Sequence, residues 1–222
     1  MDKLNAYINE VMNFAELKKS EELTNLMKKY VDMLFSWHET HNIISTRDPI
    51  YFIKRDMCDC LNICKYLPDG KLLDVGTGGG MPGILIAMIK KESQIILLDK
   101  KEKPIRFLDQ VKLKLRIENI TPVKETFENY KVKSDLSAIV LKNFSTKALT
   151  KMDYYQKVLS ITKTARKNLG TNLPVYFLTG SNALSLRKHI EEKSENEKNR
   201  LSLTEIKSPF FQNRRYLVQS WT

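Results

Sequence analysis

The sequence predicts an α/β fold with a mostly parallel sheet, a C-terminal antiparallel hairpin and an N-terminal helical extension. From residue 71 onward, short apolar runs alternate with amphipathic stretches at helical spacing. A glycine-rich turn joins the first apolar run to the first of these helices. The last two apolar runs, near 201–207 and 215–221, have no helix between them, so we expect them to pair as a hairpin.

The individual elements follow from periodicity and capping. Residues 1–38 carry apolar side chains at helical spacing and predict two helices that lie on the rest of the chain. A third helix, about 48–66, is expected to begin at Asp48-Pro49, since aspartate caps a helix and proline fits its first turn. The other elements are strand 71–75, helix 82–91, strand 94–98, helix 103–117, strands 119–123 and 137–141, helix 147–168, strand 173–179 and helix 182–193. We therefore expect a helical extension over residues 1–68 and an α/β domain over 69–222.

Charge and hydropathy narrow the function classes. The 222 residues carry a formal net charge of +11. Acidic residues slightly outnumber basic ones over 1–70, so the whole excess lies in 71–222. A basic α/β domain suits a protein that approaches a polyphosphate backbone, although a lysine-rich composition alone gives the same bias. With no apolar run of about 18 residues and no signal-peptide pattern at the start, we expect no membrane segment and a cytoplasmic location.

The most informative segment is the turn Asp74-Val75-Gly76-Thr77-Gly78-Gly79-Gly80-Met81-Pro82-Gly83. A strand that reverses into a helix beside an adenosine-bearing ligand needs several positions without a Cβ. Gly78, Gly80 and Gly83 match the dinucleotide pattern G-x-G-x-x-G. Pro82, however, lacks an N–H that would hold a pyrophosphate, and Asp74 is expected to place a carboxylate beside the pocket. That charge suits the sulfonium and ammonium of S-adenosylmethionine better than an anionic dinucleotide.

A second acidic residue supports the same cofactor. The next buried strand, Ile95-Ile96-Leu97-Leu98, ends in Asp99, which we expect to accept both ribose hydroxyls of the adenosine. The alternative is a ligand-free α/β domain in which Asp74 and Asp99 are ordinary capping acids. Three cysteines, Cys58, Cys60 and Cys64, crowd one helical segment and predict buried reduced thiols rather than a metal site or a disulfide.

Several segments together resemble one enzyme family. They are the turn Asp74 to Gly83, the strand end Leu97-Leu98-Asp99, and the stretches Trp37 to Pro49, Lys103 to Leu108 and Leu115 to Ile120. This pattern resembles the RsmG (GidB) family of bacterial small-subunit ribosomal RNA methyltransferases, from about Trp37 to Tyr130 and more weakly to Trp221. The resemblance implies a Rossmann-like class I S-adenosylmethionine-dependent methyltransferase that methylates N7 of a guanine in 16S rRNA. The substrate is either naked 16S rRNA or the same rRNA within the 30S subunit or an assembly intermediate, and we expect a monomer that needs no metal.

The resemblance also assigns site residues. The expected cofactor-binding residues are Asp74, Gly76, Gly78, Gly80, Met81, Asp99, Phe127, Glu128 and Lys142, and the expected catalytic residues are Lys142 and Arg215. Phe127 has an alternative interpretation as a core side chain. Guanine N7 carries a lone pair and no proton, so the reaction needs in-line placement rather than a general base.

Three residues depart from the family pattern. Lys142 stands where the family has arginine, Asp56 where it has histidine, and Thr179 where it has lysine. Lysine keeps the charge but loses the planar fork of a guanidinium, and we expect Lys142 to be an exposed strand-end cation. Candidate RNA contacts are Lys142, Arg215, Arg47 and the group Lys100, Lys101, Lys103 and Arg106. Two alternatives stay open: an assembly factor that binds the cofactor without turnover, and a nicotinamide-dependent oxidoreductase.

Overall fold

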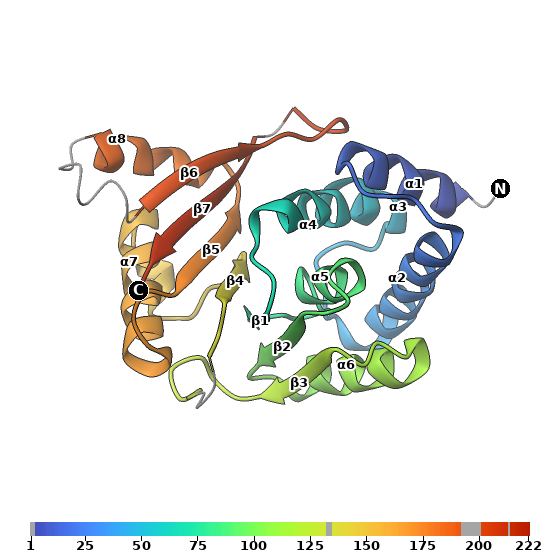
Figure 1. Cartoon of the computed structure of the whole chain (residues 1–222), viewed down its shortest axis with the longest axis horizontal. Coiled ribbons are helices and arrows are strands. Elements are labelled where there is room, and N and C mark those ends of the chain that lie inside the picture. The colour runs from blue at the N-terminus through green and yellow to red at the C-terminus, as the bar shows by residue number, and fades with distance from the viewer. Residues whose placement is uncertain (1–2, 132–134, 192–200, 213) are drawn as a thin grey trace.

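The computed structural model describes residues 3–131, 135–191, 201–212 and 214–222, and in them a single seven-stranded sheet orders the strands β3-β2-β1-β4-β5-β7-β6 (Figure 1). The first five strands in this order are parallel to one another, and β7 is antiparallel to both β5 and β6. The strands are β1 Lys71–Val75, β2 Gln94–Asp99, β3 Ile120–Lys124, β4 Ala138–Lys142, β5 Pro174–Thr179, β6 Leu201–Ile206 and β7 Arg215–Trp221. The predicted mostly parallel sheet with a C-terminal hairpin is confirmed.

Helices cover both faces of the sheet. Figure 1 shows α1, α2 and α4 to α6 on one side, and α7 and α8 on the other. The helices are α1 Lys3–Phe14, α2 Glu21–His41, α3 Pro49–Phe52, α4 Cys58–Ile63, α5 Gly83–Ile89, α6 Glu102–Leu115, α7 Tyr154–Leu169 and α8 Leu186–Glu191. Buried side chains of α1 and α2, such as Ile8 and Tyr30, belong to the same apolar cluster as Leu85 of α5 and Phe107 of α6. The extension therefore shares one core with the sheet, and a domain boundary between residues 68 and 69 stays a prediction.

The third helix is continuous but not uniform. Asp48 caps it as predicted, since its Oδ1 accepts hydrogen bonds from the backbone N–H groups of Ile50 (2.8 Å) and Tyr51 (3.1 Å). Between α3 and α4 the backbone forms a π-helical segment, Ile53–Met57, and a 3₁₀ turn, Cys64–Tyr66, follows α4. Segments of π-helix occur often at functional sites, because the wider turn re-aims side chains.

Two helices differ from their predicted bounds. The helix expected at 147–168 begins only at Tyr154, because Asp153 and Gln156 form a reciprocal capping box; a 3₁₀ turn, Leu149–Lys151, precedes it. The helix expected at 182–193 is a 3₁₀ turn, Ser181–Ser185, followed by α8, and the end of that prediction lies outside the described residues. Within the described ranges, every helix is too short or too polar to cross a membrane.

Candidate active site

The glycine turn after β1 needs its glycines for space and for backbone conformation. Gly76 and Gly78 have φ values of +71° and +54°, in the left-handed region. A Cβ on Gly76 would lie 2.5 Å from Cδ2 of Phe144. The N–H groups of Gly76 and Thr77 both donate to the carbonyl oxygen of Leu98, at 2.8 and 3.1 Å, so the turn is anchored to the end of β2.

Two predicted cofactor residues have a different role. Asp74 is fully buried beneath the turn, where its Oδ2 accepts from Thr77 Oγ1 (2.7 Å) and from the N–H of Gly83 (2.9 Å). Burial raises the pKa of Asp74 to about 7. Gly80 faces the core, since a Cβ there would lie 2.5 Å from Cγ1 of Ile84. Both residues shape the turn from below, and their expected contacts with the cofactor stay a prediction.

The first of three cavities lies at the carboxyl ends of β1 and β2 and has a volume of about 370 Å³. Four predicted cofactor residues line it: Gly76, Asp99, Phe127 and Glu128. Asp99 is held in place because its Oδ2 accepts from the N–H of Gly78 (3.0 Å) and its Oδ1 from that of Lys101 (2.9 Å). Each carboxylate oxygen keeps a further lone pair for a hydroxyl donor.

Phe127 lines this first cavity and also belongs to the core. Its position is therefore compatible with both interpretations, as a cofactor-binding residue and as a core side chain. It is buried, and its ring meets that of Phe144 edge-on, with the centroids 6.1 Å apart. From α7, Asn168 Nδ2 donates to the carbonyl oxygens of Phe127 (3.2 Å) and Glu128 (2.8 Å). Sequence reasoning did not identify Asn168 as the residue that holds this loop.

The second cavity, about 140 Å³, lies between the glycine turn and the segment after α2. It is lined by Gly76, Gly78 and Met81 of the turn and by residues 43–46. The buried Tyr30 of α2 donates its hydroxyl to the carbonyl oxygen of Gly79 at 2.6 Å. Helix α2 thus holds the glycine turn, and the segment after α2 forms one wall of this cavity, which the sequence did not reveal.

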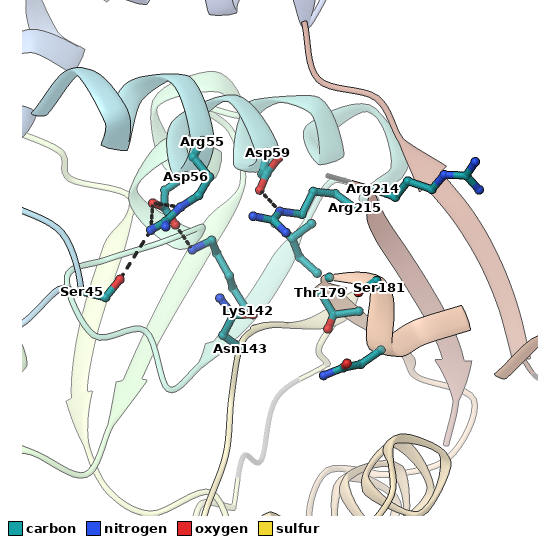
Figure 2. A pocket seen from close by; sticks show the side chains of 13 residues that line it. Ser45, Arg55, Asp56, Asp59, Lys142, Asn143, Thr179, Ser181, Arg214 and Arg215 are labelled. Carbon is teal, nitrogen blue, oxygen red and sulfur yellow. Dashed lines mark hydrogen bonds and ion pairs between the residues drawn. The ribbon is translucent and has the colours of Figure 1, made fainter. Parts of the chain in front are cut away.

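The third and most polar cavity, about 530 Å³, joins both predicted catalytic residues (Figure 2). It is lined by Ser45, Arg55, Asp56, Asp59, Lys142, Asn143, Leu178, Thr179, Gly180, Ser181, Asn182, Arg214 and Arg215. Lys142 and Arg215 each face a carboxylate from the helical stretch over residues 49–66, which comprises α3, the π-helical segment and α4. Lys142 Nζ lies 2.5 Å from Asp56 Oδ1, and Arg215 Nε lies 2.9 Å from Asp59 Oδ2.

The electrostatics of this cavity are those of buried ion pairs. Arg55 also binds Asp56, through Nε (2.9 Å) and Nη2 (2.6 Å) to Oδ2 (Figure 2). Burial would lower the pKa of Lys142, but the neighbouring Cys60 and Asp56 raise it, so the amine stays protonated. Burial raises the pKa of Asp59 to about 6, against the opposing effect of Arg215. The expectation that Lys142 is exposed is wrong, because it lies in this network with 13% of its side chain accessible.

Two of the three departures from the family pattern contact each other. Asp56 and Lys142 form the ion pair just described, so their charges compensate within the cavity. Thr179 lines the same cavity from the end of β5. Asp59 was not identified from the sequence, although one signal was available: it is a carboxylate in a helix whose other side chains are buried.

The remaining candidates lie on the surface or in the core. Arg47 and the group Lys100, Lys101, Lys103 and Arg106 are exposed, and only Lys100 of these lines one of the three cavities. The three cysteines are buried free thiols, as predicted. In the described part of the chain, no cluster of three or more His, Cys, Asp or Glu side chains could hold a metal ion.

Adjacent cavities share lining residues. Gly76 borders the first and second, whereas Ser45, Asp56, Lys142 and Asn143 border the second and third. The three cavities therefore adjoin one another along the carboxyl edge of the parallel strands, which is where open α/β sheets bind ligands, and we call this row of cavities the trough.

Solved structures share this fold. The delta-N METTL16 MTase domain matches with a TM-score of 0.57 at 12% identity, covering 88% of this chain and 96% of that one. A methyltransferase from Geobacter sulfurreducens matches with a TM-score of 0.54 at 10% identity, over 100% of this chain and 98% of that one. The Streptococcus mutans protein SMU.1697c in complex with SAH has a TM-score of 0.50 at 11% identity, over 76% and 99%. At these identities the likeness establishes the Rossmann-like methyltransferase fold.

Sequence relatives are more specific. The family model described as rRNA small subunit methyltransferase G (GidB) matches residues 23–168. Ribosomal RNA small subunit methyltransferase G of Pectobacterium atrosepticum is 35% identical over 139 residues, which are 63% of this chain and 68% of that protein. Its counterpart in Acinetobacter baylyi is 43% identical over 113 residues, or 51% and 53% of the two chains. The chain therefore belongs to the rRNA small subunit methyltransferase G (GidB) family.

Proposed function

We propose that this S-adenosylmethionine-dependent rRNA methyltransferase transfers its methyl group to N7 of a guanine in 16S rRNA. The observation that carries the proposal is the row of adjoining cavities that forms the trough. Its first cavity suits an adenosine, and its third is polar, charged and large enough for a nucleotide base. The second cavity lies between them, where a methyl donor and an acceptor atom would meet.

The residues of the first two cavities fit S-adenosylmethionine. Gly76 and Gly78 leave bare backbone along the trough, and a side chain at Gly76 would have to displace Phe144. Asp99, at the end of β2, would accept the ribose hydroxyls, while Phe127 and Glu128 would flank the adenine. Gly76 and Met81 would border the methionine portion beside Lys142. In this assignment Asp74 acts through the shape of the turn.

The proposed chemistry asks little of the side chains as acids or bases. When bound, S-adenosylmethionine supplies a methyl group on its sulfonium sulfur. As the N7 lone pair forms the new nitrogen–carbon bond, the methyl–sulfur bond breaks and the sulfonium becomes a neutral thioether. No proton leaves N7. Lys142 is protonated and paired with Asp56, so it would orient and hold rather than accept a proton. The carboxylates of Asp56 and Asp59 would favour the positive charge that the purine acquires.

The partner assignments belong to the same proposal. Family membership supports 16S rRNA as the substrate, either in the 30S subunit or in an assembly intermediate, and a cytoplasmic site of action. The exposed basic residues at the start of α6, together with Arg47, would contact phosphates near the trough. We propose that the protein acts as a monomer.

The test is methyl transfer from labelled S-adenosylmethionine to 30S particles and to naked 16S rRNA, both from a strain that lacks the modification. Nucleoside analysis should show label in 7-methylguanosine. Label in another nucleoside would overturn the N7 assignment. Tight S-adenosylmethionine binding without transfer to either substrate would instead favour a cofactor-binding assembly factor.

A further inference from the structure

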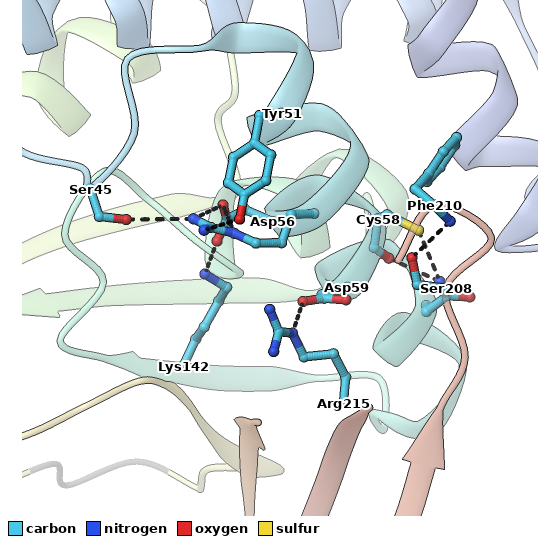
Figure 3. Close-up of polar contacts among 11 residues, drawn as sticks. Ser45, Tyr51, Asp56, Cys58, Asp59, Lys142, Ser208, Phe210 and Arg215 are labelled. Atoms are coloured by element: carbon cyan, nitrogen blue, oxygen red, sulfur yellow. Dashed lines mark hydrogen bonds and ion pairs between the residues drawn. The ribbon is translucent and has the colours of Figure 1, made fainter. Parts of the chain in front are cut away.

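We propose that Asp59 and Arg215 together read the Watson–Crick edge of the target guanine, leaving N7 free to face the methyl donor. This inference rests on the proposed function and assigns the base-specific contacts in the third cavity. The pair joins α4 to the first residue of β7 across the cavity (Figure 3). Only 6% of the Asp59 side chain and 26% of the Arg215 side chain are accessible.

The pair keeps unused hydrogen-bonding groups. Arg215 donates through Nε to Oδ2 of Asp59, and within the described residues neither of its Nη groups donates a hydrogen bond. Oδ1 of Asp59 likewise accepts none there. The guanidinium lies against the backbone of Gly180, where an added Cβ would be 3.4 Å from Nη1, an ordinary contact distance. Figure 2 shows the terminal nitrogens of Arg215 on the side that faces Lys142.

The other charged pair in the cavity is already satisfied. Oδ1 of Asp56 binds Lys142, and its Oδ2 accepts two hydrogen bonds from Arg55. The third nitrogen of that guanidinium, Nη1, donates to the hydroxyl of Tyr51 at 3.0 Å. The free acceptor and free donors of the Asp59–Arg215 pair are therefore the groups best placed to bind a ligand.

Between them the two residues offer N–H donors and a carboxylate acceptor, which are the groups that the Watson–Crick edge of guanine requires. The Watson–Crick edge of guanine presents the O6 acceptor next to the N1–H and N2–H donors, whereas adenine presents a donor at N6 next to an acceptor at N1. Arg215 would donate to O6, and Asp59 would accept from N1–H. Adenine in the same position would leave buried polar groups unpaired, which is the strong form of substrate discrimination. Because N7 lies on another edge, these contacts do not block it.

The same contact strengthens during the reaction. Methylation at N7 leaves the purine positively charged, so N1–H becomes a stronger donor to the carboxylate. A hydrogen bond that strengthens toward the transition state increases the rate, not only the affinity. Asp59 would therefore influence both the choice of base and turnover.

The test compares the unmutated protein with Asp59→Asn on 30S particles that lack the modification. The amide can still accept from Arg215 Nε but presents N–H where the base needs an acceptor. We expect kcat/KM to fall roughly 10- to 100-fold. Binding of S-adenosylhomocysteine by calorimetry should be unchanged. As a matched control, Asp69→Asn removes a carboxylate from an exposed ion pair with Lys90 and should change neither value.

Base selectivity distinguishes reading from simple positioning. Particles reconstituted with adenine in place of the mapped target guanine should be poor substrates for the unmutated protein. In Asp59→Asn the ratio of kcat/KM on guanine particles to kcat/KM on adenine particles should fall about tenfold or more. An unchanged ratio together with full turnover would overturn the inference. Failure of the unmutated protein to form 7-methylguanosine would instead overturn the proposed function. If Asp59→Asn does not fold, Arg215→Lys, which keeps the charge but loses the fork, is expected to give the same loss and decides the question.

Discussion

The two ends of the trough are built by different means. At the cofactor end the geometry depends mainly on the backbone. Gly76 and Gly78 adopt left-handed conformations, and backbone N–H groups donate hydrogen bonds to the carboxylate of Asp99. At the substrate end the geometry depends on buried side-chain ion pairs that join the third helix to β4 and β7. A site made from one continuous turn is encoded locally, whereas a site made from ion pairs depends on the whole fold.

The largest effect is expected from Gly76→Ala at the cofactor end. The new Cβ would meet Phe144 at 2.5 Å in a residue with φ of +71°. Overpacking and strain together should cost about 2–5 kcal/mol of cofactor binding or stability. Gly170→Ala is the matched control, because φ there is +117° but nothing lies within 4 Å of the added Cβ.

The two glycine variants distinguish the effect of a steric clash from the effect of backbone strain. We expect Gly170→Ala to lower the free energy of unfolding by about 1 kcal/mol and to leave S-adenosylhomocysteine affinity unchanged. Calorimetric titration of both variants measures this. Equal affinity in Gly76→Ala and the unmutated protein would show that the turn does not form the cofactor site.

Lys142→Ala should have the next largest effect, at the substrate end. It removes one partner of a buried ion pair, so Asp56 keeps only Arg55. We expect loss of most methyl transfer and destabilisation of about 1–3 kcal/mol, as the carboxylate is left undersatisfied. The double variant Asp56→Asn with Lys142→Gln should recover stability but not turnover. Full methyl transfer by Lys142→Ala would remove this residue from the site.

Asp99→Ala tests a side chain at the cofactor end that is itself held by backbone hydrogen bonds. It removes a side chain that also orients the backbone at Gly78 and Lys101. We expect S-adenosylmethionine affinity to fall by about 1.5–3 kcal/mol. The unmutated protein should bind NAD far more weakly than S-adenosylmethionine, which a parallel titration checks. Comparable affinity for both cofactors, or no effect of the substitution, contradicts the assignment of Asp99.

Tyr30→Phe asks whether the N-terminal helices contribute to the cofactor end. It leaves the carbonyl oxygen of Gly79 without its 2.6 Å hydrogen bond. We expect a loss of about 1–2 kcal/mol in unfolding free energy and a few-fold weaker S-adenosylhomocysteine binding. Tyr176→Phe is the control, since within the described residues the hydroxyl of this buried β5 tyrosine makes no hydrogen bond. Equal cofactor affinity in both variants would limit Tyr30 to a structural role.

A pH dependence is expected at the substrate end. Burial raises the pKa of Asp59 to about 6, and the groups that face it are Arg215 on β7, Lys142 on β4 and Asp56 on its own helix. Turnover should therefore rise as pH increases through about 6, when the carboxylate forms. Because the folded pKa is raised, the contribution of Asp59 to stability has the opposite sign: it is full below the unfolded pKa and lost as pH rises through 6. The Asp59→Asn profile should lack this step.

The same contrast explains which features the sequence could predict. Alternation of apolar runs located every strand within two residues, because buried parallel strands are nearly continuous apolar segments. The capping box that starts α7 at Tyr154 is present in the sequence as Asp153 and Gln156, but the predicted start at residue 147 did not take it into account. Local signals of this kind are readable in principle.

The parts of the site that were missed are long-range contacts. Asp59 and Arg215 are 156 residues apart, and Tyr30 and Gly79 are 49 apart, so only the folded sheet brings them together. The hydrogen bonds of Asp74 to Thr77 and Gly83 were also missed, because a strand-end position does not say which groups a side chain will meet. The sequence predicted the site where residue identity determines the backbone geometry, as in the glycine turn. It did not predict side-chain orientations that depend on packing in the folded protein.

The most direct test of the proposed reaction is mass spectrometry of nucleosides from purified 16S rRNA with and without this gene. Deletion should remove one 7-methylguanosine, which the unmutated gene restores and the Lys142→Ala variant does not. Mapping that nucleotide would also supply the target for the base-exchange experiment with Asp59→Asn. An unchanged content of 7-methylguanosine after deletion would contradict methylation of guanine N7 in 16S rRNA by this protein.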